Sequence, residues 1–171
     1  MLLFYIILAF VIIQRIAELI FAKRNEKLAF KKGGVEFDRG GYKVIVLMHT
    51  CFFLSLITEF FYFSRSLNSY WYIYFALFVL AQAFRYWTIL TLGKKWNTRI
   101  IIVPGTTLVT KGPFRFMKHP NYSAVITELL VLPMMFSCYF TAGIFTLLNL
   151  LALKRRIRIE EQALAKLERD P

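Results

Sequence analysis

Long apolar runs are the feature that most constrains this 171-residue chain. Residues 2–22, 43–63 and 70–92 are each predominantly apolar over about twenty positions, the length that crosses a hydrocarbon layer about 30 Å thick as a helix. Hydrophobic residues make up 58% of the chain, above the roughly 45–50% of a soluble domain, and the excess falls in these runs. The pattern predicts an all-α, polytopic membrane protein.

Two shorter apolar segments, 122–137 and 139–153, are predicted to form a helical hairpin that turns near 137–139, just after Pro133. Each arm is short for a bilayer, so the pair either spans with local thinning or packs against the other helices. The charged segment 154–169 is predicted to continue the fifth helix on the cytoplasmic side. We expect one domain, 1–171, with about five transmembrane helices.

Basic residues predict the orientation of these helices. Nineteen of the 22 Lys and Arg residues lie in three stretches, 23–43, 94–118 and 154–169, whereas the opposite side keeps only Arg65. Because basic loops stay in the cytoplasm, we predict five spans with the N-terminus outside and the C-terminus cytoplasmic. Topology and contact with anionic lipid account for the net charge of +12, so we predict no nucleic-acid partner.

Several ionisable residues lie inside the predicted spans. Arg15 and Glu18 are three residues apart and can pair on one helix face, either as a structural contact or beside a cavity. Arg85 is close to the cytoplasmic end of its segment and is expected to extend its side chain to the interface. Glu128 lies in the fourth segment.

The stretch 93–121 differs from the rest of the chain because glycine and proline interrupt it. Its IIIVPGTTLV sequence, 100–109, predicts a short β-hairpin, and irregular backbone near a membrane is tolerated where it lines a cavity. The following GPFRFMKHPNY, 112–122, ends in Pro120 and Asn121, which predict a helix start capped by Asn121. A lone His119 in such a place is more often structural than catalytic, and no ligand spacing predicts a metal site.

A second polar block is RRIRIEE, 155–161. Arg156 and Glu160 are four residues apart and can pair along a helix, which is typical of a solvated charged face. The alternative is that Glu160 and Glu161 bind ribose hydroxyls or offset a cationic ligand.

Together these residues carry a family resemblance. GPFRFMKHPNY, then Glu128, Pro133 and the Arg156-x-x-x-Glu160-Glu161 block resemble the isoprenylcysteine carboxyl methyltransferase family over nearly the whole chain. Upstream, QRIAELIFAKRNE (14–26) and GKKWNT (93–98) are similar to its bacterial branch, which includes alkylpyrone O-methyltransferases linked to type III polyketide synthases.

The resemblance implies methyl transfer from S-adenosylmethionine to an anionic oxygen, a carboxylate or an enolate, in a helical pocket near the cytoplasmic face. His119 and Tyr122 would hold the amino-acid end of the cofactor, and Arg115 would orient the acceptor, with Asn97 and Arg99 as further catalytic candidates. The implied cofactor-binding residues are Gly112, His119, Pro120, Asn121, Tyr122, Glu128, Arg156, Glu160 and Glu161.

The implied partners are membrane lipids, an amphiphilic acceptor such as an alkylpyrone or a prenylcysteine that enters from the bilayer, and a polyketide synthase that supplies it. The implied location is a bacterial cell membrane. Two departures stand out: Lys118 replaces the family's usual Arg, which loses a fork of donors, and the chain stops at Pro171, which we expect to remove part of a lid.

Two other functions remain open from the sequence. Membrane sterol reductases use NADPH and resemble this family in the same C-terminal region, although they are larger. A non-enzymatic membrane interaction protein would be indifferent to the loss of His119 or Glu160.

Overall fold

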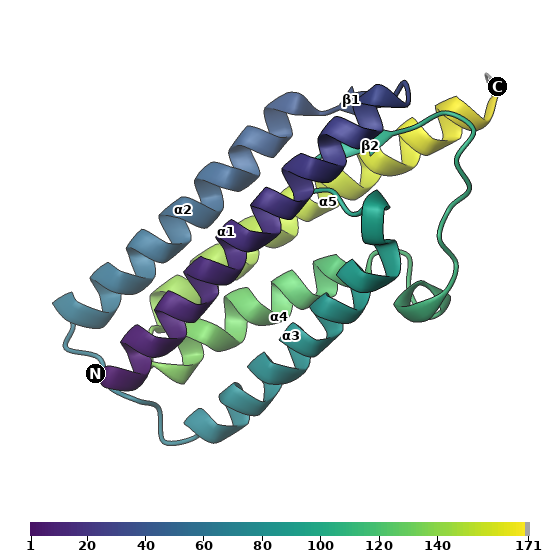
Figure 1. The fold of residues 1–171 in the computed structure, drawn as a ribbon. Helices are drawn as coiled ribbons and strands as arrows, with labels where there is room; N and C mark the ends of the chain where they lie inside the picture. Colours follow the sequence, from purple (N-terminus) through teal and green to yellow (C-terminus); the bar gives the residue numbers. More distant parts are fainter. Residues whose placement is uncertain (170–171) are drawn as a thin grey trace. The chain divides into compact units, whose positions relative to one another are not determined.

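The computed structural model describes the backbone of residues 1–169 and the side chains of residues 1–165. The expected loss of a lid at Asp170 and Pro171 lies outside the described residues. In chain order (Figure 1) the elements are α1 (Leu2–Lys31), β1 (Val35–Phe37), α2 (Arg39–Tyr62), α3 (Trp71–Leu92), the 3-10 turn η1 (Gly93–Lys95), β2 (Ile100–Ile102), the 3-10 turn η2 (Gly112–Arg115), α4 (Pro120–Met135) and α5 (Tyr139–Arg169).

Three helices are long and apolar enough to cross a membrane: α1, α2, and α3 extended through η1. The prediction that each of the first three apolar segments forms a helix able to cross a membrane is thereby confirmed. Helix α4 has 16 residues and measures about 24 Å, so it is shorter than the hydrocarbon layer. The count of five spans therefore stays a prediction.

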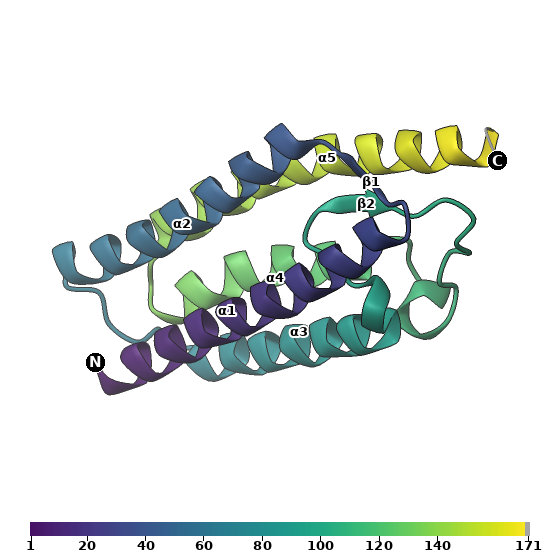
Figure 2. The same ribbon diagram turned by 45° about the horizontal axis from the view of Figure 1, so that its top comes forward.

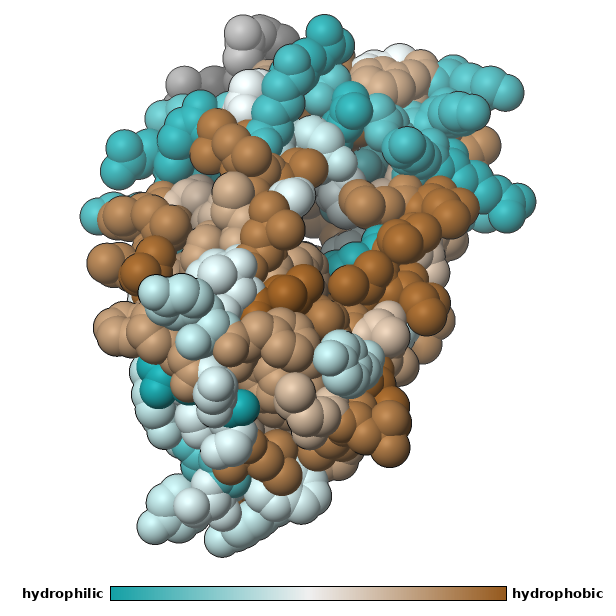
Figure 3. All heavy atoms as spheres, turned by 90° about the vertical axis from the view of Figure 1, so that its left-hand side faces the viewer, coloured by the Kyte–Doolittle hydropathy of each residue, from teal (hydrophilic) through white to brown (hydrophobic). Residues whose placement is uncertain are grey.

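Helix α1 buries one narrow stripe and exposes the rest of its apolar surface. The buried positions follow one another at intervals of three and four residues: Phe4, Ile7, Val11, Gln14, Glu18, Ala22 and Asn25. Outward-facing side chains such as Ile13 and Ile20 are exposed, as expected for a lipid-facing surface. Hydrophobic side chains cover most of the face drawn in Figure 3.

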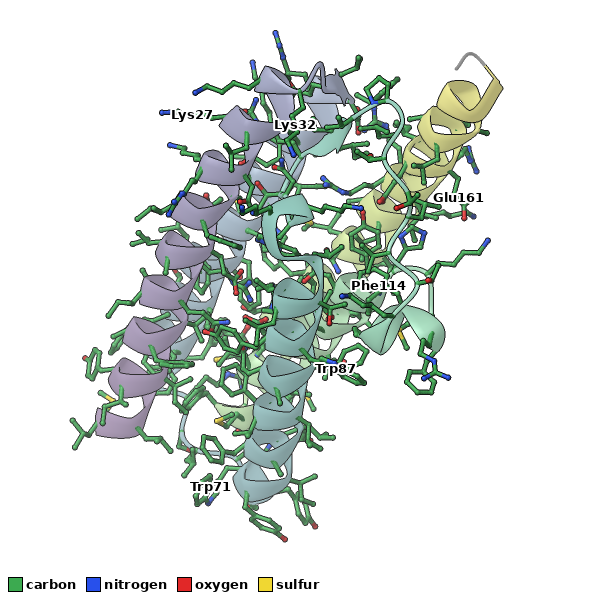
Figure 4. All side chains as sticks on the ribbon, turned by 45° about the vertical axis from the view of Figure 1, so that its right-hand side comes forward. Lys27, Lys32, Trp71, Trp87, Phe114 and Glu161 are labelled. Carbon is green, nitrogen blue, oxygen red and sulfur yellow. The ribbon has the colours of Figure 1, made fainter. Side chains whose placement is uncertain are left out.

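The first span is predicted over about 2–22, and the helix that carries it, α1, continues to Lys31. The added turns are charged and extend past the apolar run. Lys27 lies in this part of the helix and Lys32 directly follows it (Figure 4).

A small antiparallel sheet joins residues that are distant in the sequence. Strand β1 pairs with β2 in the register Val35↔Ile102, Glu36↔Ile101 and Phe37↔Ile100. The predicted hairpin within 100–109 is therefore wrong, since β2 pairs with a strand 65 residues earlier. The fold is mostly helical rather than strictly all-α.

The chain forms two compact units. Unit 1 comprises residues 1–42, 92–108 and the part of α5 from Arg156 onward. Unit 2 comprises residues 43–91 and 109–155.

Within unit 2, α2 runs beside the first half of α5, and α3 runs beside α4 (Figures 1 and 2). Phe52 of α2 meets Phe145 of α5 edge to face, with ring centroids 5.7 Å apart. Near the end of α2, Glu59 Oε2 accepts hydrogen bonds from both the backbone N and Oγ1 of Thr141, each at 2.7 Å. Arg65 Nη2 donates to Glu59 Oε1 at 3.2 Å. Glu59 therefore fastens α2 to the first turn of α5.

The predicted hairpin between the fourth and fifth segments is confirmed. Helix α4 ends at Met135, Ser137 has a positive φ of 56°, and α5 begins at Tyr139. Helix α5 then continues without interruption through the charged segment, as the sequence predicted.

Candidate functional site

The first candidate region lies where η2 leads into α4 in unit 2. Pro120 is the first residue of α4 and His119 is the residue before it, with no side-chain hydrogen bond capping the helix. The expectation that Asn121 caps the helix is wrong, because Asn121 already lies inside the first turn. Proline is suited to the first position, where its missing N–H costs no helical hydrogen bond.

His119 and Tyr122 form a stacked ring pair at this helix start. Their ring centroids are 5.1 Å apart and their planes differ by 9°. The three-residue spacing, with the Tyr122 backbone N bonded to the His119 carbonyl O at 3.1 Å, holds both rings on one side of the first turn. Two residues that the sequence selected are thus brought together.

Asn121 adds an acceptor to the same turn. Its side-chain Oδ1 is buried and has no hydrogen-bond donor among the side chains and backbone that the structure describes. The first-turn N–H groups of a helix also carry partial positive charge. At the start of α4, the first-turn N–H groups can therefore bind an anion, and Asn121 Oδ1 can accept a hydrogen bond from a ligand.

The loop before α4 approaches α3 closely. Gly112 has a φ of +61°, and a Cβ atom there would come within 2.7 Å of Thr91 Oγ1. Gly112 thus has a structural reason to be glycine.

The residues after Gly112 continue along α3. The ring centroids of Trp87 on α3 and Phe116 are 6.5 Å apart, and Figure 4 marks Trp87 and the η2 residue Phe114. Arg115 is exposed at the end of η2.

Glu128 lies two turns into α4 and is paired with α3. Arg85 Nη2 lies 2.7 Å from Glu128 Oε2, with side chains only 3% and 6% exposed. The expectation that Arg85 extends to the interface is wrong, since a buried partner holds it inside unit 2. The predicted pairing of Arg15 with Glu18 on α1 is confirmed at 2.7 Å.

The second candidate region is the loop 93–99 in unit 1. The Asn25 side chain, buried on α1, donates from Nδ2 to the carbonyl O atoms of Gly93 at 3.0 Å and Trp96 at 2.8 Å. Arg156 of α5 is also buried and donates from Nη2 to the Thr98 carbonyl O at 2.8 Å. Two helices therefore fix the backbone of this loop.

Arg99 is held by acidic side chains of the same unit. Its Nη1 lies 2.9 Å from Glu26 Oε1 and 3.3 Å from Glu36 Oε1, and its guanidinium lies 4.9 Å from the ring centroid of Tyr42. Asn97 Oδ1 accepts a hydrogen bond from the backbone N of Arg99 at 3.4 Å. Of these two catalytic candidates, Arg99 is engaged in an ion-pair network.

The carboxylates of the second block lie on α5 in unit 1. Glu160 is half-buried and Glu161 is exposed, and Arg156 precedes Glu160 by one helical turn (Figure 4 marks Glu161). Sequence reasoning selected these residues but missed Asn25 and Trp96. Their signal was present, because both lie in the two upstream stretches quoted for the family resemblance.

Comparisons with known proteins cover the region of the chain that contains both polar blocks. Residues 73–166 match the family model described as the Isoprenylcysteine carboxyl methyltransferase (ICMT) family. The chain is 42% identical over 161 residues, 94% of this chain and 96% of the relative, to a Bacillus subtilis protein described as uncharacterized protein YpbQ. It is 29% identical over 145 residues, 84% of each chain, to an uncharacterized protein of Haemophilus influenzae. No solved structure matches significantly.

Proposed function

The chain belongs to the isoprenylcysteine carboxyl methyltransferase family, and on that premise we propose that this integral membrane methyltransferase uses S-adenosylmethionine to methylate an anionic oxygen of an amphiphilic acceptor. The observation that carries the proposal is the start of α4, where the His119 and Tyr122 rings stack and Asn121 Oδ1 is buried without a donor among the described residues.

These residues fit the amino-acid end of the cofactor. A carboxylate is favoured at a helix N-terminus, and an ammonium group supplies the donor that Asn121 Oδ1 accepts. On α5, Glu160 and Glu161 are carboxylates that accept hydrogen bonds from ribose hydroxyls. Bound S-adenosylmethionine supplies an electrophilic methyl group on a sulfonium.

The protein itself needs to position and dry the reactants. A carboxylate or an acidic enolate is already anionic at neutral pH, so no side chain has to remove a proton. The remaining tasks are alignment and exclusion of water. We assign the holding of the anionic oxygen to Arg115, the exposed cation four residues before His119.

Two of the selected residues have a positioning role in this proposal. Arg99 binds Glu26 and Glu36 through Nη1, so it orders the loop 93–99. Glu128, bound to Arg85, fixes α4 against α3 below the helix start.

The acceptor proposed here is an amphiphile such as an alkylpyrone, delivered through the bilayer from a polyketide synthase. Exposed apolar side chains on α2 and α3, including Leu54 and Leu80, suit an alkyl chain. The proposed topology has five spans, with the N-terminus outside a bacterial cell membrane and the C-terminus in the cytoplasm.

The test uses the full chain in lipid nanodiscs. Calorimetry with S-adenosylhomocysteine and, separately, with NADPH decides the cofactor, and mass spectrometry of host lipids with and without the protein, using a labelled methyl donor, identifies the acceptor. We expect binding of S-adenosylhomocysteine and a labelled lipid that His119→Ala abolishes. Binding of NADPH alone would move the protein to the reductases, and binding of neither, with no labelled lipid, would leave an interaction protein.

A further inference from the structure

The Trp96 side chain is a buried hydrogen-bond donor that no described acceptor satisfies. Its indole is 4% exposed, and Nε1 has no acceptor among the residues that the structure describes. An indole N–H only donates, and buried donors are nearly always satisfied in folded proteins. A lipid tail or a neighbouring apolar side chain cannot accept this proton.

The position of Trp96 is fixed on both sides. Its own carbonyl O accepts from Asn25 Nδ2 at 2.8 Å, and the carbonyl O of Thr98, two residues later, accepts from Arg156 Nη2 at 2.8 Å. The indole is therefore presented by an ordered segment of backbone.

A second donor lies three residues further along. Arg99 Nε is also buried without an acceptor among the described residues, although the same guanidinium binds Glu26 and Glu36 through Nη1. The two carboxylates are held by that guanidinium, and Glu36 is also bound by Arg39 at 3.2 Å. The unsatisfied N–H groups of Trp96 and Arg99 therefore require an acceptor other than the Glu26 and Glu36 carboxylates.

We propose that Trp96 donates its indole N–H to an oxygen of a bound reactant. The matching chemistry is a carboxylate or enolate oxygen, which belongs either to the methyl acceptor or to the amino-acid end of the cofactor. This inference rests on the proposed function and adds to it a binding residue that neither polar block contains.

The test compares Trp96→Phe, which removes the N–H and keeps an aromatic ring, with Trp71→Phe as a matched control. Trp71 is 36% exposed at the start of α3 (Figure 4). Calorimetry gives the affinity for S-adenosylhomocysteine, and transfer of labelled methyl into a host lipid extract gives the half-saturating amount of extract.

We expect Trp96→Phe either to lower the affinity for S-adenosylhomocysteine or to raise the half-saturating amount of lipid extract, by about tenfold. We expect Trp71→Phe to change neither quantity. A loss of S-adenosylhomocysteine affinity assigns the oxygen to the cofactor. A higher half-saturating amount of lipid extract at normal S-adenosylhomocysteine affinity assigns the oxygen to the acceptor. Unchanged values for both overturn the inference while the proposed function stands, and a wild-type protein without either activity overturns both.

A spectroscopic measurement covers the case in which Trp96→Phe does not fold. In a Trp71→Phe/Trp87→Phe background Trp96 is the single indole, and ultraviolet resonance Raman spectra report the hydrogen bond of its N–H. We expect that band to shift on adding S-adenosylhomocysteine or the lipid extract. A band that shifts with neither overturns the inference.

Discussion

Arg85 and Glu128 join α3 to α4 through an ion pair of 2.7 Å that is almost completely buried. Removing one partner leaves an uncompensated charge inside the helices, whereas removing both does not. We expect Glu128→Gln to lower the free energy of unfolding by about 3–5 kcal/mol and Arg85→Met/Glu128→Leu to cost much less. Chemical unfolding in detergent measures both.

The double variant also separates the two roles of Glu128. If Glu128 positions α4, Arg85→Met/Glu128→Leu keeps most of its affinity for S-adenosylhomocysteine. A folded double variant that loses the cofactor would make Glu128 a direct ligand, as the family resemblance implied.

The two polar blocks are each expected to bind the cofactor. His119→Ala removes one ring of the stacked pair, and Glu160→Ala removes a carboxylate of α5. Each lost hydrogen bond to a charged group is worth about 1.5–3 kcal/mol, or roughly a ten- to hundredfold loss of S-adenosylhomocysteine affinity by calorimetry. His49→Ala on α2 and Gln162→Ala on α5 are the matched controls, and equal binding in all four variants would remove these blocks from the cofactor site.

Arg115 is expected to act on the acceptor and not on the cofactor. An anion that leaves water for a dry site needs a fixed cation, and Arg115 is exposed beside the start of α4. With saturating methyl donor, Arg115→Gln should lower kcat/KM for the acceptor by at least tenfold at normal cofactor affinity, while Lys111→Gln, at the other end of the same turn, changes little. Unchanged acceptor kinetics would make Arg115 a contact for lipid phosphate.

Topology is expected to follow the basic stretches. A reporter fused after Pro171 should be active in the cytoplasm and inactive outside, because nineteen of 22 basic residues lie in stretches assigned to that side. Activity of the fusion outside the cell would reverse the orientation.

Cys138 is expected to resist alkylation. It lies in the turn between α4 and α5, where burial, with a smaller contribution from the Glu59 carboxylate, raises the pKa of its thiol to about 12. Because the thiolate is the reactive form, the folded protein in a Cys51→Ser background should stay unlabelled by maleimide at pH 7–8, and denatured protein should label fully. Rapid labelling of the folded protein would show that the turn opens.

The sequence predicted what depends on local pattern. Apolar run length gave the spanning helices, three-residue spacing gave the Arg15–Glu18 pair, and Pro133 with the polar turn gave the α4–α5 hairpin. The sequence also selected His119 and Tyr122, which stack at the start of α4, and their role as cofactor ligands stays a prediction.

What the sequence did not predict depends on distant partners. Strand β2 pairs with three residues far upstream, and Arg85 finds Glu128 43 positions away, so neither pairing leaves a periodic signal. The extension of α1 to Lys31 was missed because a charged helix beyond the apolar run has no hydropathy signature. Asn25 and Trp96 lie in the two stretches quoted for the family resemblance, but their hydrogen bonding appears only in the folded loop 93–99.

The Glu59 contact also bears on how the chain is made. Thr141, whose backbone N and hydroxyl both bind Glu59, is synthesised 82 residues later, an interval of about 4–16 s at 5–20 residues per second. During that interval Arg65, six residues away, is the cation available to Glu59. Arg65 can therefore pair with Glu59 before Thr141 exists, whereas the two hydrogen bonds from Thr141 can form only after the start of α5 has been made.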